Sequence, residues 1–288
     1  MFIPALTTYD WWVLSSSAGK DSAAMLDYLV EQAHRVGFPL DRIVVVHCDL
    51  GRFEWPSTRE LGQDLVDRFG DRPGTLELAR LQAERYGLRF EVRGRTQSDL
   101  LDQVRHYGYW PTARSRYCTS AFKREVVTKF ITELVDESNL DRPVRILNCM
   151  GMRAEESSAR AKRPQFKPHD TVYRSNGRRV VDTYLPIHLW TLSEVWDRVE
   201  LSRVQHHWAY DAGMSRLSCS FCILASLADL VTAAKLRPEL AREYAKTERE
   251  IDHDFKQGLS MAALIERAAG DHSVPRPKPG LQLPLMVL

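Results

Sequence analysis

Eight consecutive residues, Ser15–Ser22 (SSSAGKDS), have the composition of a reactive turn. Small residues expose backbone N–H groups, hydroxyls add donors, and Lys20 adds a mobile cation beside the carboxylate of Asp21. A turn of this kind at a helix start binds anions, because unpaired N–H groups and the positive end of the helix dipole face one point. Asp21 is suited to hold a magnesium ion through water. We therefore expect a phosphate site, with an ordinary strand-to-helix turn as the alternative.

A Cys-x-x-Cys pair, Cys219 and Cys222, forms a second candidate site among apolar residues. The pair alone is compatible with zinc, a redox disulfide or an iron–sulfur cluster. A complete zinc site needs two more ligands, and the nearby His206 and His207 lack the spacing of a zinc finger. The spacing by itself leaves these three kinds of site open.

The composition restricts the classes of protein that need to be considered. The chain has 288 residues, of which 44% are hydrophobic and 27% charged, and its net charge is +2. These values are typical of a globular protein, and binding to nucleic acid would need a local basic face. The residues before Asp10 lack the basic region of a signal peptide, and no apolar run approaches the length of a membrane helix. We expect a cytoplasmic protein.

The five cysteines are then expected to be reduced, and clustered cysteines in a reducing compartment indicate metal or redox chemistry. Cys48 and Cys149 fall within predicted strands, so we interpret them as small buried hydrophobic residues.

Strands and helices alternate around the candidate sites. Trp11–Leu14 and Arg42–Gly51 are predicted strands, and apolar residues at helical spacing from Met25 to Val36 predict a helix between them. The later predicted elements are a helix over Leu76–Tyr86, a strand over Leu88–Gly94, a helix over Ser120–Glu137, a strand within Val144–Arg153, and a helix after Thr191. Repeated strand–helix–strand units predict an α/β fold, with a parallel twisted sheet and helices on both faces.

We divide the chain into three parts. Residues 1–184 are expected to form a nucleotide-binding α/β domain, residues 185–272 a helical part with the Cys-x-x-Cys pair, and the Pro-rich residues 273–288 a flexible tail. Within the first part, Arg153–Arg179 contains eight Lys or Arg residues against three acidic ones. We predict a long surface loop or a β-excursion there. No internal repeat is present.

The order SSAGKDS resembles the PP-loop, Ser-Gly-Gly-Lys-Asp-Ser, of the ATP pyrophosphatases with the adenine nucleotide α-hydrolase fold, which is a HUP-type fold. Ala18 stands where that loop has its first glycine. The resemblance implies that the loop binds the β and γ phosphates, that ATP is cleaved between its α and β phosphates, and that Lys20 and Asp21 are catalytic. The residues that it assigns to ATP are Ser15, Ser16, Ser17, Ala18, Gly19, Lys20, Asp21 and Ser22.

Asp49 ends the second predicted strand, where the family has an acidic residue near the ribose or magnesium. Ligands of parallel α/β sheets bind at the carboxyl ends of the strands, which supports this position independently. A plain strand-ending aspartate is the alternative.

Two further segments, Arg116–Glu125 (RYCTSAFKRE) and Gly151–Arg160 (GMRAEESSAR), resemble the subfamily related to PAPS reductases. That subfamily includes the ATP pyrophosphatase of DNA phosphorothioation systems, and the resemblance extends from about Trp12 to about Ala225. It implies three catalytic residues and one binding residue: Lys123, Arg153 and Glu156, and Gly151. Cations such as the lysine and the arginine would neutralise charge on the leaving pyrophosphate.

In the same subfamily, the cysteine of the first segment meets the later Cys-x-x-Cys pair in space, and an iron–sulfur cluster is common. The resemblance therefore implies that Cys118, Cys219 and Cys222 are metal ligands of a cluster, which we expect to be of the 4Fe–4S type. Three ligands on four irons leave one iron open, and that iron could carry the sulfur atom to be transferred.

The resemblance implies an adenylating sulfurtransferase that uses ATP and Mg²⁺. Such an enzyme adenylates an acceptor oxygen, releases pyrophosphate and allows sulfur to replace AMP. DNA phosphorothioation is the first expectation, and thiolation of tRNA or of a small molecule comes next. Sulfonucleotide reductases are an alternative, although they carry a degenerate phosphate loop and a cysteine in the C-terminal tail. Here Gly-Lys-Asp-Ser is intact and no cysteine follows Cys222. A non-catalytic nucleotide-binding subunit is the third alternative.

The expected partners follow from the first expectation. A cysteine desulfurase would supply sulfur, other DNA-modification subunits would select and hold the DNA, and a homodimer is one possible assembly. Arg105–Cys118 and Arg153–Arg179 interleave cations with aromatic residues, which could hold phosphates and stack on bases. An ordinary solvated surface is the alternative for both segments.

Overall fold

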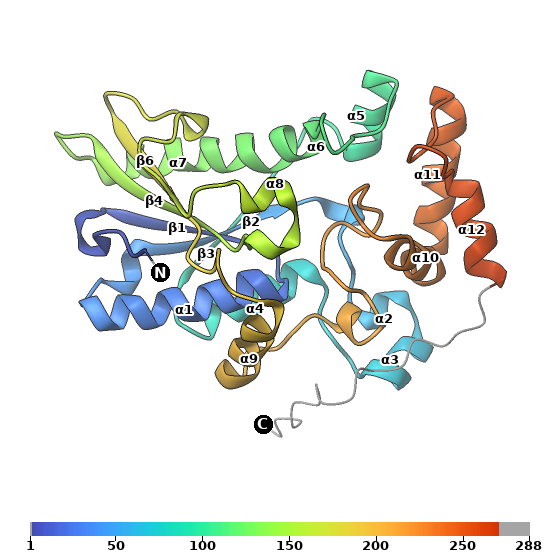
Figure 1. Cartoon of the computed structure of the whole chain (residues 1–288), viewed down its shortest axis with the longest axis horizontal. Coiled ribbons are helices and arrows are strands. Elements are labelled where there is room, and N and C mark those ends of the chain that lie inside the picture. The colour runs from blue at the N-terminus through green and yellow to red at the C-terminus, as the bar shows by residue number, and fades with distance from the viewer. Residues whose placement is uncertain (1, 271–288) are drawn as a thin grey trace.

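Six strands form one sheet in the order β3–β2–β1–β4–β6–β5 (Figure 1). The strands are β1 (Trp11–Ser16), β2 (Ile43–Asp49), β3 (Arg89–Gly94), β4 (Val144–Met150), β5 (Phe166–Lys167) and β6 (Arg179–Tyr184). Neighbouring strands pair in parallel, except that the short β5 is antiparallel to β6. This computed structural model describes residues 2–270.

Alternate residues of the strands pack against two helical layers. Trp12 and Leu14 of β1 pack with α1 (Lys20–Val36) and α9 (Leu192–Ser202), whereas Val13 packs with α7 (Glu125–Ser138) on the other face. Helix α4 (Thr75–Glu84) also contributes to the layer of α1. Successive side chains of a strand point to opposite faces, so a strand that is buried on both sides must be apolar throughout. The predicted α/β fold with helices on both faces is confirmed.

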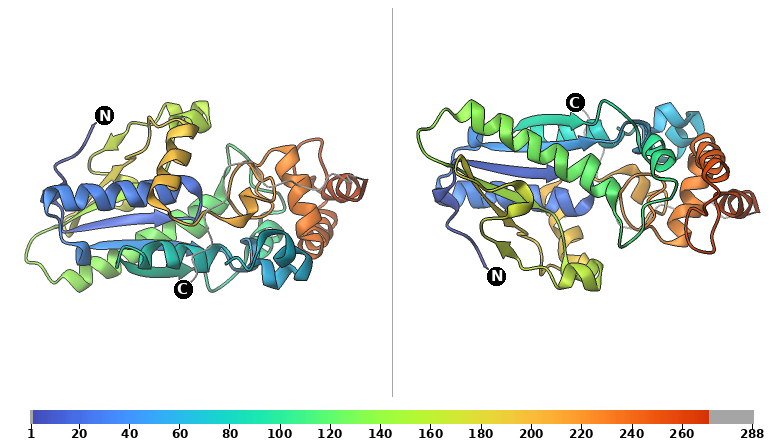
Figure 2. Two further views of the ribbon diagram at one scale, coloured as in Figure 1. Left: turned by 90° about the horizontal axis from the view of Figure 1, so that it is seen from below. Right: turned by 90° about the horizontal axis from the view of Figure 1, so that it is seen from above.

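A helical part lies beyond one end of the sheet, as both views of Figure 2 show. Its helices are α5 (Leu100–Tyr107), α10 (Leu227–Leu236), α11 (Pro238–Ile251) and α12 (Met261–Gly270). Shorter helices are α2 (Thr58–Leu61), α3 (Gln63–Phe69), α6 (Tyr117–Thr119) and α8 (Ser158–Ala161). Trp110 stacks on Tyr244 with ring centroids 5.2 Å apart, and Phe53, which follows β2, belongs to the same core cluster. This cluster fixes the helical part at the carboxyl end of β2.

Most elements predicted from periodicity are present. The helix predicted after Thr191 is α9, and a capping box of Thr191 and Glu194 starts it. The predicted helix over residues 120–137 begins with a π-helical turn, Ser120–Arg124, before α7. Residues 153–179 form a β-excursion with short helical turns and β5. The sequence analysis did not predict α5.

The predicted division at residue 184 remains a prediction. In the structure α9 packs on α1, while α10, α11 and α12 pack with one another. The tail predicted over residues 273–288 lies outside the described residues. No helix among residues 2–270 has both the length and the apolar character that a membrane span requires.

Candidate functional site

The loops that follow β1 and β4 meet at the carboxyl edge of the sheet. The strands β1 and β4 are neighbours, while β2 lies on the other side of β1, so the chain order reverses direction between β1 and β4. In open α/β sheets this reversal opens the crevice that binds ligands. An added Cβ at Gly151, just after β4, would lie 2.7 Å from the main-chain oxygen of Asp21. The structure therefore brings the two predicted nucleotide segments into backbone contact.

The turn between β1 and α1 is held by its own small side chains. The backbone N–H of Ser17 donates to Oγ of Ser22 over 3.3 Å, and that hydroxyl donates to the carbonyl of Gly19 over 2.9 Å. Ala18 has φ of +56°, a left-handed conformation that glycine adopts at lower cost. The position where the PP-loop pattern has glycine thus keeps the same backbone shape here, with a fully buried methyl group.

Lys20 is the first residue of α1, and its side chain is only 5% exposed. Its Nζ lies 3.2 Å from Oδ2 of Asp21 and 5.3 Å from the ring centroid of Tyr210. The backbone N–H of Lys20 donates to the hydroxyl of Tyr210 over 3.1 Å. Burial and the nearby Asp21 raise the pKa of Tyr210, so its hydroxyl stays protonated. The sequence analysis missed Tyr210, because no motif surrounds it.

Arg153 fastens the loop after β4 to the start of α1. Its Nε donates to Oδ1 of Asp21 over 2.5 Å, and its guanidinium also contacts Glu155. The backbone N–H of Arg153 donates to Oε2 of Glu156 over 3.0 Å, and Glu156 pairs with Arg160. The carboxylate of Asp21 therefore contacts two protein cations, and Glu156 stabilises the turn. Catalytic roles for these residues remain predictions.

Asp49 lies at the end of β2, where its Oδ1 accepts the backbone N–H of Gly51 over 2.7 Å. Two residues that the sequence analysis did not single out lie beside it. The ligand atoms of His47, Asp49 and Glu54 are all within 4.8 Å of one another. The alternation of β2 and the short turn after it could have indicated this group, since residues 47 and 49 share one face of the strand.

The three predicted cysteine ligands come together from distant segments. Burial and the neighbouring Cys222 raise the pKa of Cys118, and Lys123 acts in the opposite direction. The thiols of Cys219 and Cys222 interact with each other, which raises the pKa of Cys219 and lowers that of Cys222. The turn that contains Cys219 and Cys222 is held against the segment after β2, because the backbone N–H of Ser220 donates to the carbonyl of Phe53 over 2.8 Å.

The donor set fits an iron–sulfur cluster better than a single zinc ion. Within residues 2–270, no group of three that includes a cysteine brings its ligand atoms within 4.8 Å of one another. A zinc ion needs its ligands around one point, whereas a cluster binds each cysteine to a different iron. His206 contacts Asp211, and His207 contacts Thr75 and the backbone of Ala209, so neither histidine is poised to complete a zinc site.

Lys123 lies in the π-helical turn beside the cysteines and has an exposed side chain. Its charge opposes the effect of burial on the pKa values of Cys118 and Cys219. Cys48 also lies beside the π-helical turn, because its Sγ is 3.7 Å from the carbonyl oxygen of Lys123. The interpretation of Cys149 as a buried hydrophobic residue is confirmed, whereas Cys48 is only partly buried. The π-helical turn therefore places Lys123 beside the cysteines.

Part of the positive charge of the two basic segments is paired within the protein. Between residues 153 and 179, four cations form salt bridges: Arg153, Arg160, Lys167 and Arg178. Between residues 105 and 118, Arg105 pairs with Glu250, and Trp110 and Tyr117 are buried. The exposed surface of these segments therefore offers fewer unpaired cations and stacking rings than their composition predicts.

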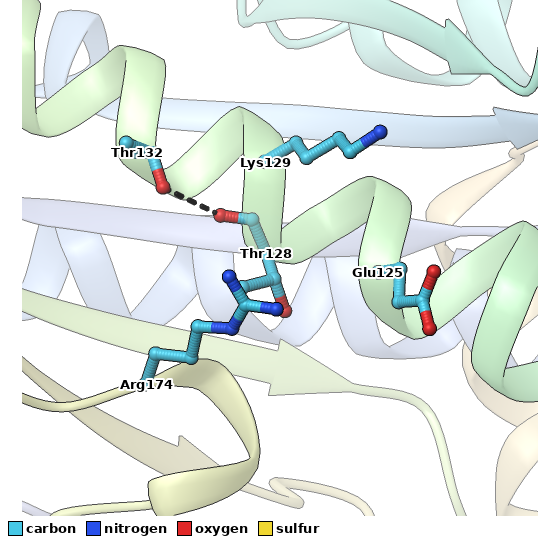
Figure 3. Close-up of a pocket in the computed structure, with 5 residues that line it drawn as sticks. All are labelled: Glu125, Thr128, Lys129, Thr132 and Arg174. Atoms are coloured by element: carbon cyan, nitrogen blue, oxygen red, sulfur yellow. Dashed lines mark hydrogen bonds between the residues drawn. The ribbon is translucent and has the colours of Figure 1, made fainter.

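Two hollows lie away from the phosphate loop. One of about 70 Å³ is lined by Glu125, Thr128, Lys129, Thr132 and Arg174 (Figure 3). A larger hollow of about 320 Å³ lies between the end of β3 and α7, around Arg95 and Lys129. Ligand pockets for drug-sized molecules are typically about 300 to 1,000 Å³, so the first hollow is too small for a nucleotide. Neither hollow is lined by a predicted site residue.

Comparisons with known proteins show the family to which the chain belongs. The model of the phosphoadenosine phosphosulfate reductase domain matches residues 12–225. The "Uncharacterized 37.8 kDa protein in gpa 5′ region" of Escherichia phage 186 is 27% identical over 178 residues, which cover 62% of this chain and 51% of that protein. The chain thus spans about half the length of this curated relative.

Solved structures are similar at a low level. The phosphoadenylyl-sulfate reductase of Candida auris is 13% identical, with a TM-score of 0.43 over 75% of this chain and 84% of that one. The U34-tRNA thiolase of Methanococcus maripaludis with its [4Fe-4S] cluster is 13% identical, with a TM-score of 0.42 over 92% and 75% of the two chains. Similarity of this degree carries no argument about function. The family model, however, spans the phosphate loop, the loop after β4 and all three cysteines, and the chain belongs to the phosphoadenosine phosphosulfate reductase domain family.

Proposed function

We propose that the protein is an ATP pyrophosphatase that cleaves ATP to AMP and pyrophosphate and adenylates an acceptor oxygen for replacement by sulfur. The observation that carries this proposal is the turn of residues 15–22 at the reversal point of the sheet. Its backbone and hydroxyl donors precede α1, and the buried cation of Lys20 lies at the first turn of that helix. This arrangement suits a polyphosphate, because helix dipole, N–H groups and cation converge.

The charged residues around the turn have complementary roles in this proposal. Lys20 and the turn bind the β and γ phosphates, and Lys123 neutralises charge that develops on the leaving pyrophosphate. Asp21 holds Lys20 and Arg153 in place, and it reaches Mg²⁺ through water. Fixed charges aimed at the leaving group stabilise the transition state more than the ground state.

The sulfur chemistry is proposed to depend on Cys118, Cys219 and Cys222 as ligands of a 4Fe–4S cluster. Such a cluster, when bound, supplies an iron position that is able to hold the sulfur atom. This chain's own residues partly bury the three cysteines, and Lys123 provides a positive charge beside them. A cysteine desulfurase is the proposed sulfur donor.

The first proposed acceptor is a non-bridging phosphate oxygen of DNA, in a cytoplasmic DNA-modification system. Adenylation converts a poor oxygen leaving group into a good one, which explains why the replacement consumes ATP. Some cations of the basic segments are paired within the protein, which supports the proposal that other subunits contribute most of the contacts to DNA. A tRNA base or a small molecule is the next proposed acceptor.

A sulfonucleotide reductase is the second candidate function, and the family description favours it. A reductase would bind a sulfonucleotide with the same anion-binding turn, and it would leave ATP intact. The two candidates therefore differ in the nucleotide that is converted.

Chromatography of the nucleotide products separates these candidates. Anaerobically prepared protein is incubated with Mg-ATP, with and without duplex DNA, and separately with PAPS and a dithiol reductant. We expect AMP and pyrophosphate, with turnover about 100- to 1,000-fold lower in Lys20→Ala. Lys246→Ala, at an exposed lysine of α11, is the matched control and should retain turnover. ADP and phosphate as products would contradict the proposal, and PAPS reduction without ATP cleavage would establish the second candidate.

A further inference from the structure

We infer that His47, Asp49 and Glu54 form a binding site for a first-row divalent metal ion. The imidazole and the two carboxylates each offer a ligand atom, and these atoms lie within 4.8 Å of one another. They come from the end of β2 and the turn that follows it, so a short stretch of chain supplies all three.

The hydrogen bonds of His47 define which ring nitrogen is available. Nδ1 lies 3.1 Å from the carbonyl oxygen of Ser16, which can only accept, so Nδ1 carries the proton. Nε2 then faces Oε2 of Glu54 over 3.0 Å, in a side chain that is only 1% exposed. Either a proton on Nε2 or a bound cation bridges these two atoms, and the third ligand atom, from Asp49, lies within reach of the same point. Metal-ligating histidines usually donate their other N–H to a carbonyl or carboxylate in this way.

The backbone also holds the carboxylates in place. Gly51 donates its N–H to Asp49, and the carbonyl of Glu54 accepts from Nη1 of Arg237 over 2.5 Å and from Oγ of Ser220 over 3.4 Å. Within residues 2–270, neither carboxylate forms a salt bridge with a lysine or an arginine. The two negative charges are therefore positioned before any ion binds, and a divalent ion balances them.

The donor set indicates the class of ion. One imidazole nitrogen and two carboxylate oxygens suit Mn²⁺, Fe²⁺ or Zn²⁺ better than Ca²⁺, which prefers oxygen ligands alone. Three protein ligands leave positions for water or a phosphate oxygen. The site lies between two turns. His47 contacts Ser16 of the turn of residues 15–22, and the backbone of Glu54 contacts Ser220 of the turn that contains Cys219 and Cys222. This site goes beyond the proposed function and is separate from the Mg²⁺ that Asp21 is proposed to reach.

Manganese titration of the full chain tests the site without nucleotide. Metal-stripped protein is titrated with Mn²⁺, and free Mn²⁺ is measured by electron paramagnetic resonance. We expect one site per chain, with affinity reduced at least about tenfold in each of Asp49→Asn, Glu54→Gln and His47→Gln. Glu239→Gln removes an exposed carboxylate of α11 and should bind like the wild type. Thiolates prefer softer ions, so Cys219→Ala should also retain Mn²⁺ binding.

Three outcomes would overturn the site. These are no stoichiometric Mn²⁺ in the wild type, equal affinity in the wild type and the Asp49 and Glu54 variants, and loss of binding in Cys219→Ala. Circular dichroism checks that each variant is folded. If His47→Gln does not fold, the comparison of Asp49→Asn with Glu239→Gln decides the question, because the Asp49 side chain lies at the less buried end of β2. Since no nucleotide is present, the result is independent of whether the protein cleaves ATP.

Discussion

The phosphate turn and the cysteine site are built in opposite ways. In the turn, several hydrogen bonds join residues at most five positions apart, such as those between Ser17 and Ser22. The cysteine site joins Cys118 to a pair about one hundred residues later, and it depends on contacts between Ser220 and the turn after β2. The first site is locally encoded, and the second exists only when the helical part packs against the sheet.

Residues far along the chain also hold the charged residues of this turn in place. Tyr210 accepts the N–H of Lys20, and Arg153 binds Asp21. A local turn can therefore have the right backbone shape while distant side chains decide how its charges are held. The following experiments separate local shape from tertiary support, beginning with the largest expected effect.

Gly151→Ala should damage the phosphate site most severely. The new Cβ would lie 2.7 Å and 2.9 Å from backbone atoms of Asp21 and 3.0 Å from the nitrogen of Ser22. Overpacking of this kind should lower the unfolding free energy by about 3 kcal/mol, which urea denaturation would measure. Displacement of the turn should lower ATP turnover more than about 100-fold. Gly177→Ala is the matched control, since a Cβ there meets nothing within 4 Å. Equal turnover in the two variants would show that the loops do not meet.

Alanine at each of Cys118, Cys219 and Cys222 should abolish iron binding but leave ATP cleavage nearly unchanged. Each change removes a ligand, so iron per chain in anaerobic protein should fall from about four to near background. ATP cleavage should remain within about threefold of the wild type, because the phosphate turn keeps its local hydrogen bonds. Cys149→Ala, at a buried cysteine of β4, should retain its iron. Retention of iron in all three variants would exclude these cysteines as the ligands.

Tyr210→Phe should weaken the tertiary support of the turn while preserving the ring beside Lys20. The hydroxyl accepts the N–H group of Lys20, so its loss should lower the unfolding free energy by about 1 kcal/mol. We expect the KM for ATP to rise about threefold to fivefold, since the α1 terminus is held less firmly. Tyr107→Phe, at an exposed tyrosine of α5, serves as the control. An unchanged KM would mean that the turn is held by local bonds alone.

His207 should make the folded protein slightly less stable in acid than at neutral pH. Burial, with Arg72 and His206 nearby, lowers the pKa of His207 from 6.5 to about 3. Between these values the unfolded chain binds the extra proton, so stability is complete above pH 6.5 and falls as the pH decreases. Between pH 7 and 5.5 the wild type should lose about 1 kcal/mol more unfolding free energy than His207→Asn.

Urea denaturation at several pH values measures that difference. Asparagine keeps an acceptor for the N–H of Ala209, which His207 now binds over 3.1 Å, but it does not titrate. His34→Asn, at an exposed histidine of α1, should show the same pH dependence as the wild type. Parallel curves for the wild type and His207→Asn would contradict the assignment of the acid loss to this residue.

Much of the fold could be predicted from the sequence, because periodicity reports local geometry. The run of residues 42–51 predicted β2, and a helix was predicted after Thr191, where α9 begins. The π-helical turn of residues 120–124 was not predictable, since its sequence also suits a regular helix. Helix α5 was missed even though Asp99 and Asp102 form a capping box at its start.

The sequence by itself determined the turn of residues 15–22 and the alternation of strands and helices. Backbone conformation and side-chain periodicity act over a few residues and leave a pattern that can be read directly. Only the tertiary structure decided that Arg153 and Tyr210 contact the turn, that some cations of the basic segments are paired internally, and that His47 faces Glu54. These contacts join residues from separate elements, and they depend on how the sheet and the helical part pack together, which no local pattern encodes.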